Sequence, residues 1–158
     1  MELESKDKDE SILRWVTFRL EKEAYGINVT QVREVLRMTE IAPVPGAPDY
    51  VMGIINLRGN VVTVIETRKR FNLPSIDTDE QTRIVIIEVE NQEVGILVDS
   101  VAEVVDLPVS AIESAPIVGN DDAAKYIQGV TSMDGELLIL VDVNKFLTEE
   151  ELQEMTSY

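Results

Sequence analysis

The chain lacks two residue types that dominate enzyme active sites. Its 158 residues include no cysteine and no histidine. Without cysteine there is no disulfide, thiol nucleophile or thiolate metal ligand, and without histidine there is no imidazole base or ligand. These absences exclude triads built on histidine or cysteine and the common zinc sites. The sequence also has no run near the roughly 20 apolar residues that span a bilayer, so we expect a cytoplasmic protein.

Basic residues are scarce and unevenly placed. The chain has 14 lysines and arginines against 30 acidic residues, a formal net charge of −16. Residues 1–83 hold 12 of the basic residues and 14 acidic ones, whereas residues 84–158 hold two and 16. An acidic surface repels phosphate backbones and anionic lipid heads. We therefore expect neither nucleic acid binding nor direct membrane insertion.

Two blocks of sequence recur in the same order. Residues 25–35 align without gaps on residues 94–104 with six identities in eleven positions, and residues 50–65 pair with residues 126–141. Near the midpoint lies Leu-Pro-Ser-Ile-Asp-Thr-Asp-Glu at 73–80, a polar stretch typical of a linker. Ordered repetition on both sides of a linker predicts an internal duplication.

Each copy reads mainly as β-strand. Alternating or β-branched runs predict hairpins at 14–29 and 83–98 and again at 51–65 and 127–143, with tight turns at Arg58-Gly59-Asn60 and Asp134-Gly135. Short helices are expected from Thr30 and from its counterpart Asp99, because both are good N-caps. Two copies of about five short strands each fit two small antiparallel β-barrels, residues 14–81 and 82–147. An acidic disordered segment, 1–13, would precede them, and an amphipathic helix and tail, 144–158, would follow.

An ordered set of motifs carries a resemblance to a known family. It comprises Tyr25-Gly26-Ile27, Val32-x-Glu34-Val35, Val44-Pro45-x-x-Pro48, Ile55-Asn56-Leu57-Arg58-Gly59 and Val94-Gly95 through Glu103-Val104. The set resembles CheW-type chemotaxis coupling proteins from about Trp15 to Leu147. Two departures lie in one loop: Glu66-Thr67-Arg68 replaces the family's usual Asp-Leu-Arg, and Asn72 stands near Phe71 where glycine is frequent.

The resemblance implies a mainly β protein with two SH3-like subdomains in a single CheW-like domain, 14–158. It also implies a non-catalytic, cytoplasmic adaptor in receptor arrays at the inner membrane. Such adaptors bind the cytoplasmic tip of chemoreceptors, the methyl-accepting chemotaxis proteins, and the regulatory domain of the histidine kinase CheA. The alternative is a scaffold of the same fold in a signalling pathway other than swimming.

A groove between the two barrels is the predicted receptor site, because an amphipathic receptor helix needs apolar walls. Its apolar candidates are Val29, Val32 and Val35 from the first copy and Val98 and Val101 from the second. Glu34 and Arg58 are the polar candidates. The second copy has Asp134 in place of Arg58, so the duplicated fold does not itself require this arginine, which could pair with Glu34 or with a partner's carboxylate.

Kinase binding is assigned to Val104, at a barrel end, and indirectly to Gly53, whose replacement would deform the nearby surface. Gly53 and Gly129 recur within strands, where glycine marks a bulge or a close backbone approach. Gly59 and Gly135 are structural residues of the two tight turns.

An enzyme is the rival class, because acidic side chains could bind a metal ion. The candidates are Asp121-Asp122 and Asp77-x-Asp79-Glu80. The second set lacks the glycine and closing glutamate of a calcium loop, and both lie in loops expected to be acidic and exposed. We therefore predict no metal, no cofactor and no catalysis.

Overall fold

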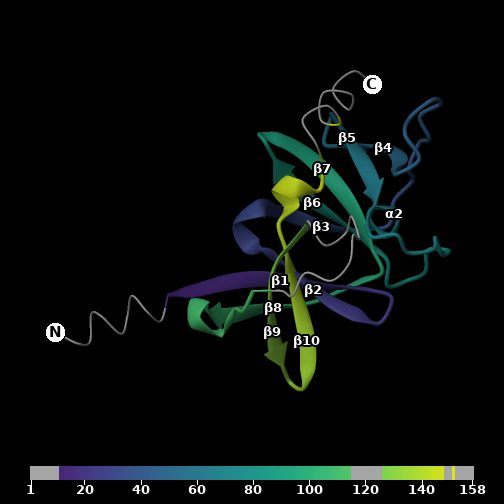
Figure 1. The fold of residues 1–158 in the computed structure, drawn as a ribbon. Helices are drawn as coiled ribbons and strands as arrows, with labels where there is room; N and C mark the ends of the chain where they lie inside the picture. Colours follow the sequence, from purple (N-terminus) through teal and green to yellow (C-terminus); the bar gives the residue numbers. More distant parts are fainter. Residues whose placement is uncertain (1–10, 115–125, 148–150, 152–158) are drawn as a thin grey trace.

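The computed structural model describes residues 11–114, 126–147 and 151. Ten strands account for most of them (Figure 1). They are β1 (Ile12–Leu20), β2 (Glu23–Asn28), β3 (Val32–Arg37), β4 (Val51–Leu57), β5 (Asn60–Glu66), β6 (Arg83–Val89), β7 (Gln92–Val98), β8 (Ser100–Pro108), β9 (Ile127–Met133) and β10 (Glu136–Val141). The described helices are short: α2 (Thr67–Arg70) and the 3₁₀ turns η1 (Val29–Gln31), η2 (Val109–Ala111) and η4 (Val143–Lys145).

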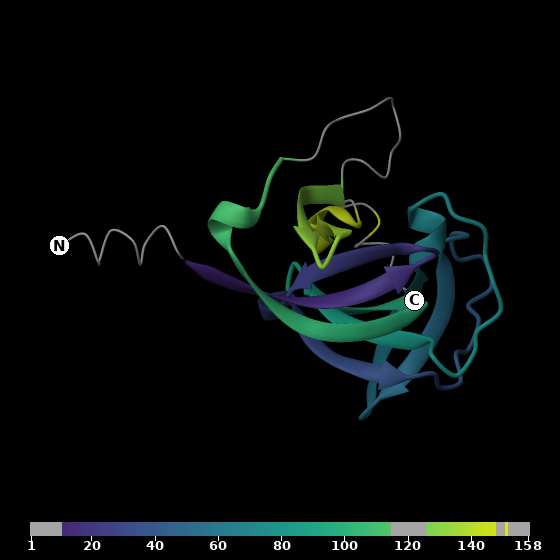
Figure 2. The same cartoon turned by 90° about the horizontal axis from the view of Figure 1, so that it is seen from below.

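The strands form two five-stranded sheets, which confirms the mainly β prediction. Sheet A has the order β8-β1-β2-β10-β9 and sheet B the order β3-β6-β7-β5-β4. Neighbours are antiparallel except for β2 with β10 and β5 with β7, which are parallel. In the described part of the chain no pairing joins the edge strands of either sheet. The sheets are therefore open and curved, as Figure 2 shows for the strands around β1, and the fold is SH3-like without closed barrels.

Each sheet takes strands from both copies, so the division at residues 14–81 and 82–147 does not separate the sheets. The first hairpin, β1–β2, completes the sheet that holds β8, β9 and β10. The equivalent hairpin, β6–β7, completes the sheet that holds β3, β4 and β5. Because the two hairpins are similar in sequence, each can occupy the place of the other. The chain crosses between the sheets after β2 and after β7.

The helix expected from Thr30 is only one 3₁₀ turn, followed by strand. Its N-cap is Asn28, whose side chain accepts a hydrogen bond from Thr30 N at 3.0 Å. β3 then pairs with β6, and the segment after Asp99 is strand β8. The spacing of Val32 and Val35 suits a helix, but β-branched residues also suit a strand, and pairing with a neighbour decides between the two.

The expected linker and the two expected end segments can be compared with the structure. Residues 73–80 contain no helix or strand, as expected of a linker. β1 begins at Ile12, inside the segment expected to be disordered, and the rest of that segment, 1–10, lies outside the described residues. The expected C-terminal helix begins with the 3₁₀ turn η4, and its residues 148–150 and 152–158 lie outside the described residues. The proposed metal ligands Asp121 and Asp122 lie outside them as well. No described helix has the length and apolar character needed to span a membrane.

The largest hydrophobic cluster joins the two sheets. It combines buried residues of sheet A, such as Phe18 and Ile27, with buried residues of sheet B, such as Ile87 and Ile96. Tyr25 stacks on Phe18 with ring centroids 5.5 Å apart. Two smaller clusters lie within the individual sheets. The shared cluster makes the two sheets one packed unit.

Tyr25 makes the stability of this core sensitive to alkaline pH. Burial, with a smaller contribution from Glu23, raises the pKa of Tyr25 from 10.0 to about 12. The folded protein therefore keeps this proton between pH 10 and 12 while the unfolded chain releases it. The contribution, roughly 2 kcal/mol, is fully present below pH 10 and is lost as the pH approaches 12. Urea unfolding at pH 9 to 12 should show that the free energy of unfolding falls more steeply with pH for the wild type than for Tyr25→Phe. An equal fall in the two proteins would contradict this.

Candidate functional site

An ion pair connects the two edges of sheet B. Glu34 lies on β3, at one edge, and Arg58 lies in the turn after β4, at the other. Arg58 Nη1 donates to Glu34 Oε1 at 3.3 Å, and Arg58 Nη2 donates to Glu34 Oε2. The pair therefore bridges the gap that backbone pairing leaves open.

The turn that carries Arg58 needs a glycine. Arg58 has φ +51° and Gly59 has φ +88°, the left-handed geometry of a two-residue type I′ turn. Gly59 N also donates to Asn56 Oδ1 at 2.9 Å. Asp134 and Gly135 repeat the same turn in sheet A, with φ +54° and +79°. The sequence Arg-Gly thus holds the arginine at the tip of its hairpin.

Electrostatics keep both partners charged. The hydrogen bond from Arg58 lowers the pKa of Glu34, and the same bond raises the pKa of Arg58. Because both groups are at the protein surface, the pair contributes little to stability. A surface ion pair of this kind serves better for recognition than for folding.

The structure separates the predicted valines by exposure. Val35 is 41% exposed on β3, and Val29 is half-buried. Val32 and Val101 pack partly against the core shared by the sheets, and Val98, 1% exposed, belongs to it. Val98 therefore presents no surface to a partner. Its assignment to the receptor groove is corrected to a packing role, because a side chain of β7 is covered by both sheets.

Val104 lies on β8 at the position that corresponds to Val35 on β3. It is 53% exposed. Val61 and Leu137, again equivalent in the two copies, are exposed as well. The duplication thus places an exposed apolar side chain on the edge strand of each sheet and another on the inner strand of its second hairpin. Exposed apolar residues on edge strands are typical of contact surfaces.

Gly53 and Gly129 stand where the backbone of a connecting segment comes very close. A Cβ on Gly53 would lie 2.2 Å from Ala42 O, and a Cβ on Gly129 would lie 2.7 Å from Ile112 Cγ2. Both glycines also adjoin a register shift in their hairpins. Gly53 therefore allows the close approach of residue 42 to β4.

Arg68, which the sequence did not single out, organises a buried polar cluster. Its side chain is 7% exposed. Nε and Nη2 donate to the two carboxylate oxygens of Asp99 at 2.9 and 2.6 Å, and Nη1 donates to Glu21 and to the Pro74 carbonyl. Hydrogen bonding to Asp99, more than to Glu21, raises the pKa of Arg68. The only sequence signal was the motif Glu66-Thr67-Arg68, whose long-range partners no local pattern predicts.

The loop after α2 takes the backbone geometry expected of it. Asn72 has φ +59°, the left-handed conformation in which asparagine is the best substitute for glycine. Arg70, at the end of α2, donates to the carbonyl of Phe146 and to both carboxylate oxygens of Glu151. This part of the chain therefore fastens the segment after β10 to sheet B.

Within the described residues, no group of three acidic side chains lies close enough together to hold a metal ion. Asp77, Asp79 and Glu80 lie in the linker. Asp79 instead accepts hydrogen bonds from Gln81 N at 2.8 Å and Thr82 N at 3.2 Å.

Known proteins share both the sequence pattern and the fold. Residues 14–151 match the model of the CheW-like domain. The chain is 37% identical to the chemotaxis protein CheW of Bacillus subtilis over 89% of this chain and 90% of that protein, and 34% identical to CheW of Treponema pallidum over 90% and 86%. The crystal structure of the scaffolding protein TtCheW from Thermoanaerobacter tengcongensis superposes with a TM-score of 0.80 at 32% identity, over 86% of this chain and 92% of that one. The chain therefore belongs to the CheW-like family of chemotaxis scaffold proteins, which are not enzymes.

Proposed function

We propose that the protein couples chemoreceptors to the histidine kinase CheA, as an adaptor that holds both and catalyses nothing. The observation that carries the proposal is the match to the CheW-like domain over residues 14–151. The sequence adds support, because a chain without histidine and cysteine has few groups for catalysis.

The receptor surface is centred on β3. Glu34 and Arg58 supply two opposite charges in fixed positions, and Val35 supplies exposed apolar area on the same strand as Glu34. An amphipathic receptor helix offers both kinds of group. We keep Val29, Val32 and Val101 as candidate contacts because each is partly exposed, whereas Val98 belongs to the core.

We propose that the kinase binds at β8, and the exposure of Val104 on this strand supports the proposal. Gly53 acts through the shape of β4. Because a small apolar patch gives a contact of modest affinity, such a surface suits an assembly that forms reversibly.

Breaking the ion pair should weaken receptor binding and leave the fold intact. We expect Glu34→Lys or Arg58→His to lower affinity for receptor-bearing membranes by roughly tenfold, the effect of losing a charge-assisted hydrogen bond. Co-sedimentation with those membranes measures the affinity, and thermal unfolding checks the fold. Arg14→His is the control, because Arg14 forms an exposed pair with Asp106 in sheet A.

Kinase binding is measured in parallel with purified CheA. If both variants sediment like the wild type, the receptor surface lies elsewhere. If the wild type sediments with neither receptor membranes nor CheA, the adaptor function itself is wrong.

A further inference from the structure

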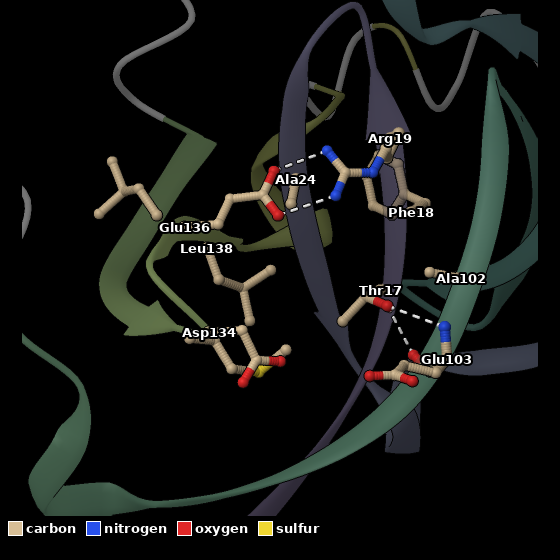
Figure 3. Close-up of a pocket in the computed structure, with 11 residues that line it drawn as sticks. Thr17, Phe18, Arg19, Ala24, Ala102, Glu103, Asp134, Glu136 and Leu138 are labelled. Atoms are coloured by element: carbon tan, nitrogen blue, oxygen red, sulfur yellow. Dashed lines mark hydrogen bonds and ion pairs between the residues drawn. The ribbon is translucent and has the colours of Figure 1, made fainter.

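Sheet A has a pocket at the place that corresponds to the Glu34–Arg58 pair of sheet B. Its volume is about 140 Å³. Thr17 and Leu138 are buried at its floor, while Glu103 and Asp134 lie at its exposed mouth (Figure 3). The pocket therefore combines an apolar interior with an acidic entrance.

The duplication relates this pocket to the ion pair residue by residue. Glu103 corresponds to Glu34, and Asp134 corresponds to Arg58. The edge strands share a register shift next to the two glutamates, opposite Ile86–Ile87 in sheet B and Val16–Phe18 in sheet A. Sheet B thus supplies an arginine to its glutamate, whereas sheet A places a second acid at the equivalent turn.

The acids at the mouth have no cation of their own. Arg19 is already engaged, because its Nη1 and Nη2 donate to the two carboxylate oxygens of Glu136 at 2.7 and 2.8 Å. In the ranges that the structure describes, neither the Glu103 nor the Asp134 carboxylate accepts a hydrogen bond or forms an ion pair. Figure 3 shows both at the end of the pocket away from the Arg19–Glu136 pair. Two unpaired carboxylates beside apolar walls favour a cationic side chain with an apolar stem.

We infer that this pocket binds an arginine side chain from a loop of a partner protein, in the position that Arg58 occupies in sheet B. A guanidinium group and its adjoining methylenes are about the size of the benzene that fills a cavity of about 150 Å³. Arginine is favoured over lysine, because its planar group donates to two carboxylates at once. Ala24, Met133 and Leu138 line the pocket and provide the apolar contact for the stem.

A short peptide tests the site without any chemotaxis partner. The probe is Ac-Gly-Leu-Arg-Gly-Leu-Gly-NH₂, titrated at millimolar concentration into the isotopically labelled full chain and followed by NMR. We expect shifts at the amides of Thr17, Glu103 and Asp134, and binding roughly tenfold weaker when citrulline replaces arginine, since citrulline keeps the shape and loses the charge. Equal binding of the citrulline peptide, or shifts confined to other residues, would overturn the inference.

Variants of the chain separate the site from a general acidic attraction. The double variant Glu103→Gln, Asp134→Asn should bind the arginine peptide roughly tenfold more weakly. Glu93 is an exposed acid of sheet B, and Glu93→Gln should leave this binding unchanged. Asp134→Arg should abolish binding by placing an arginine of the chain beside Glu103, as in sheet B. Peptide binding that survives in either pocket variant, with unchanged thermal unfolding, would exclude the site. Such a result would not count against the proposed coupling of receptor and kinase, because the experiment contains neither protein.

Discussion

Replacing Arg68 by alanine should lower the free energy of unfolding by about 2–3 kcal/mol, the cost of losing charge-assisted hydrogen bonds to two carboxylates that remain partly in contact with water. The guanidinium is almost fully covered and bonds to both oxygens of Asp99. It also binds Glu21 in the turn of sheet A and the carbonyl of Pro74 in the linker. Removing it leaves two acids close together and breaks the contact between a turn of sheet A, the crossing into β8 and the linker.

Urea denaturation at neutral pH measures this loss through the midpoint and slope of the transition. Arg14→Ala is the matched control, because the Arg14–Asp106 pair is exposed and exposed pairs contribute at most about 1 kcal/mol. Arg68→Lys should fall between the two, since an ammonium group keeps the charge but cannot bond to Asp99 in the planar two-point geometry. A loss below about 1 kcal/mol for Arg68→Ala would show that the cluster does not hold the sheets together.

Gly53→Ala should lower the free energy of unfolding by about 3 kcal/mol, the upper range for forcing an extra methyl group into a packed site. The new Cβ would lie 2.2 Å from the carbonyl oxygen of Ala42 and 2.8 Å from its carbon. That backbone cannot move away freely, because Ala42 N donates to Ile54 O at 2.9 Å and Ile54 N donates to Ala42 O at 2.8 Å. The strain would reach the surface of β4, so we also expect weaker binding to CheA.

Two other glycines calibrate the effect. Gly129→Ala should lower the free energy of unfolding less, since the nearest backbone atom, Glu113 O, would lie 3.0 Å from the new Cβ, against 2.2 Å for Ala42 O at Gly53. Gly46→Ala meets nothing within 4 Å and should cost only the left-handed backbone penalty at φ +82°, about 1–2 kcal/mol. Chemical denaturation measures the free energy of unfolding of the three variants and so ranks them. If Gly53→Ala were no worse than Gly46→Ala, the close approach of β4 to residue 42 would not constrain the strand.

Much of the fold follows from local pattern. Alternating and β-branched runs located the strands, and Arg58-Gly59 and Asp134-Gly135 located the two type I′ turns, because a two-residue hairpin needs positive φ at both positions. Repetition gave the equivalence of Glu34 with Glu103. The structure then showed the Glu34–Arg58 bond that the difference between the two copies had suggested.

The wrong predictions concern segments whose conformation or burial depends on residues distant in the sequence. Val32 and Val35 are spaced for a helix, but pairing with β6 makes the segment a strand. Val98 could have faced a groove, yet the packing of both sheets on β7 covers it.

The sequence by itself determined the duplication, the four hairpins with their turns, and the family, because each of these depends on the order of neighbouring residues. Only the tertiary structure decided that each sheet takes a hairpin from the other copy, that Arg68 binds Asp99 and Glu21, and that Glu103 and Asp134 share a pocket. The physical reason is that two similar hairpins fit either sheet on local grounds. The choice between them, and the charges that meet as a result, depend on how the whole chain packs.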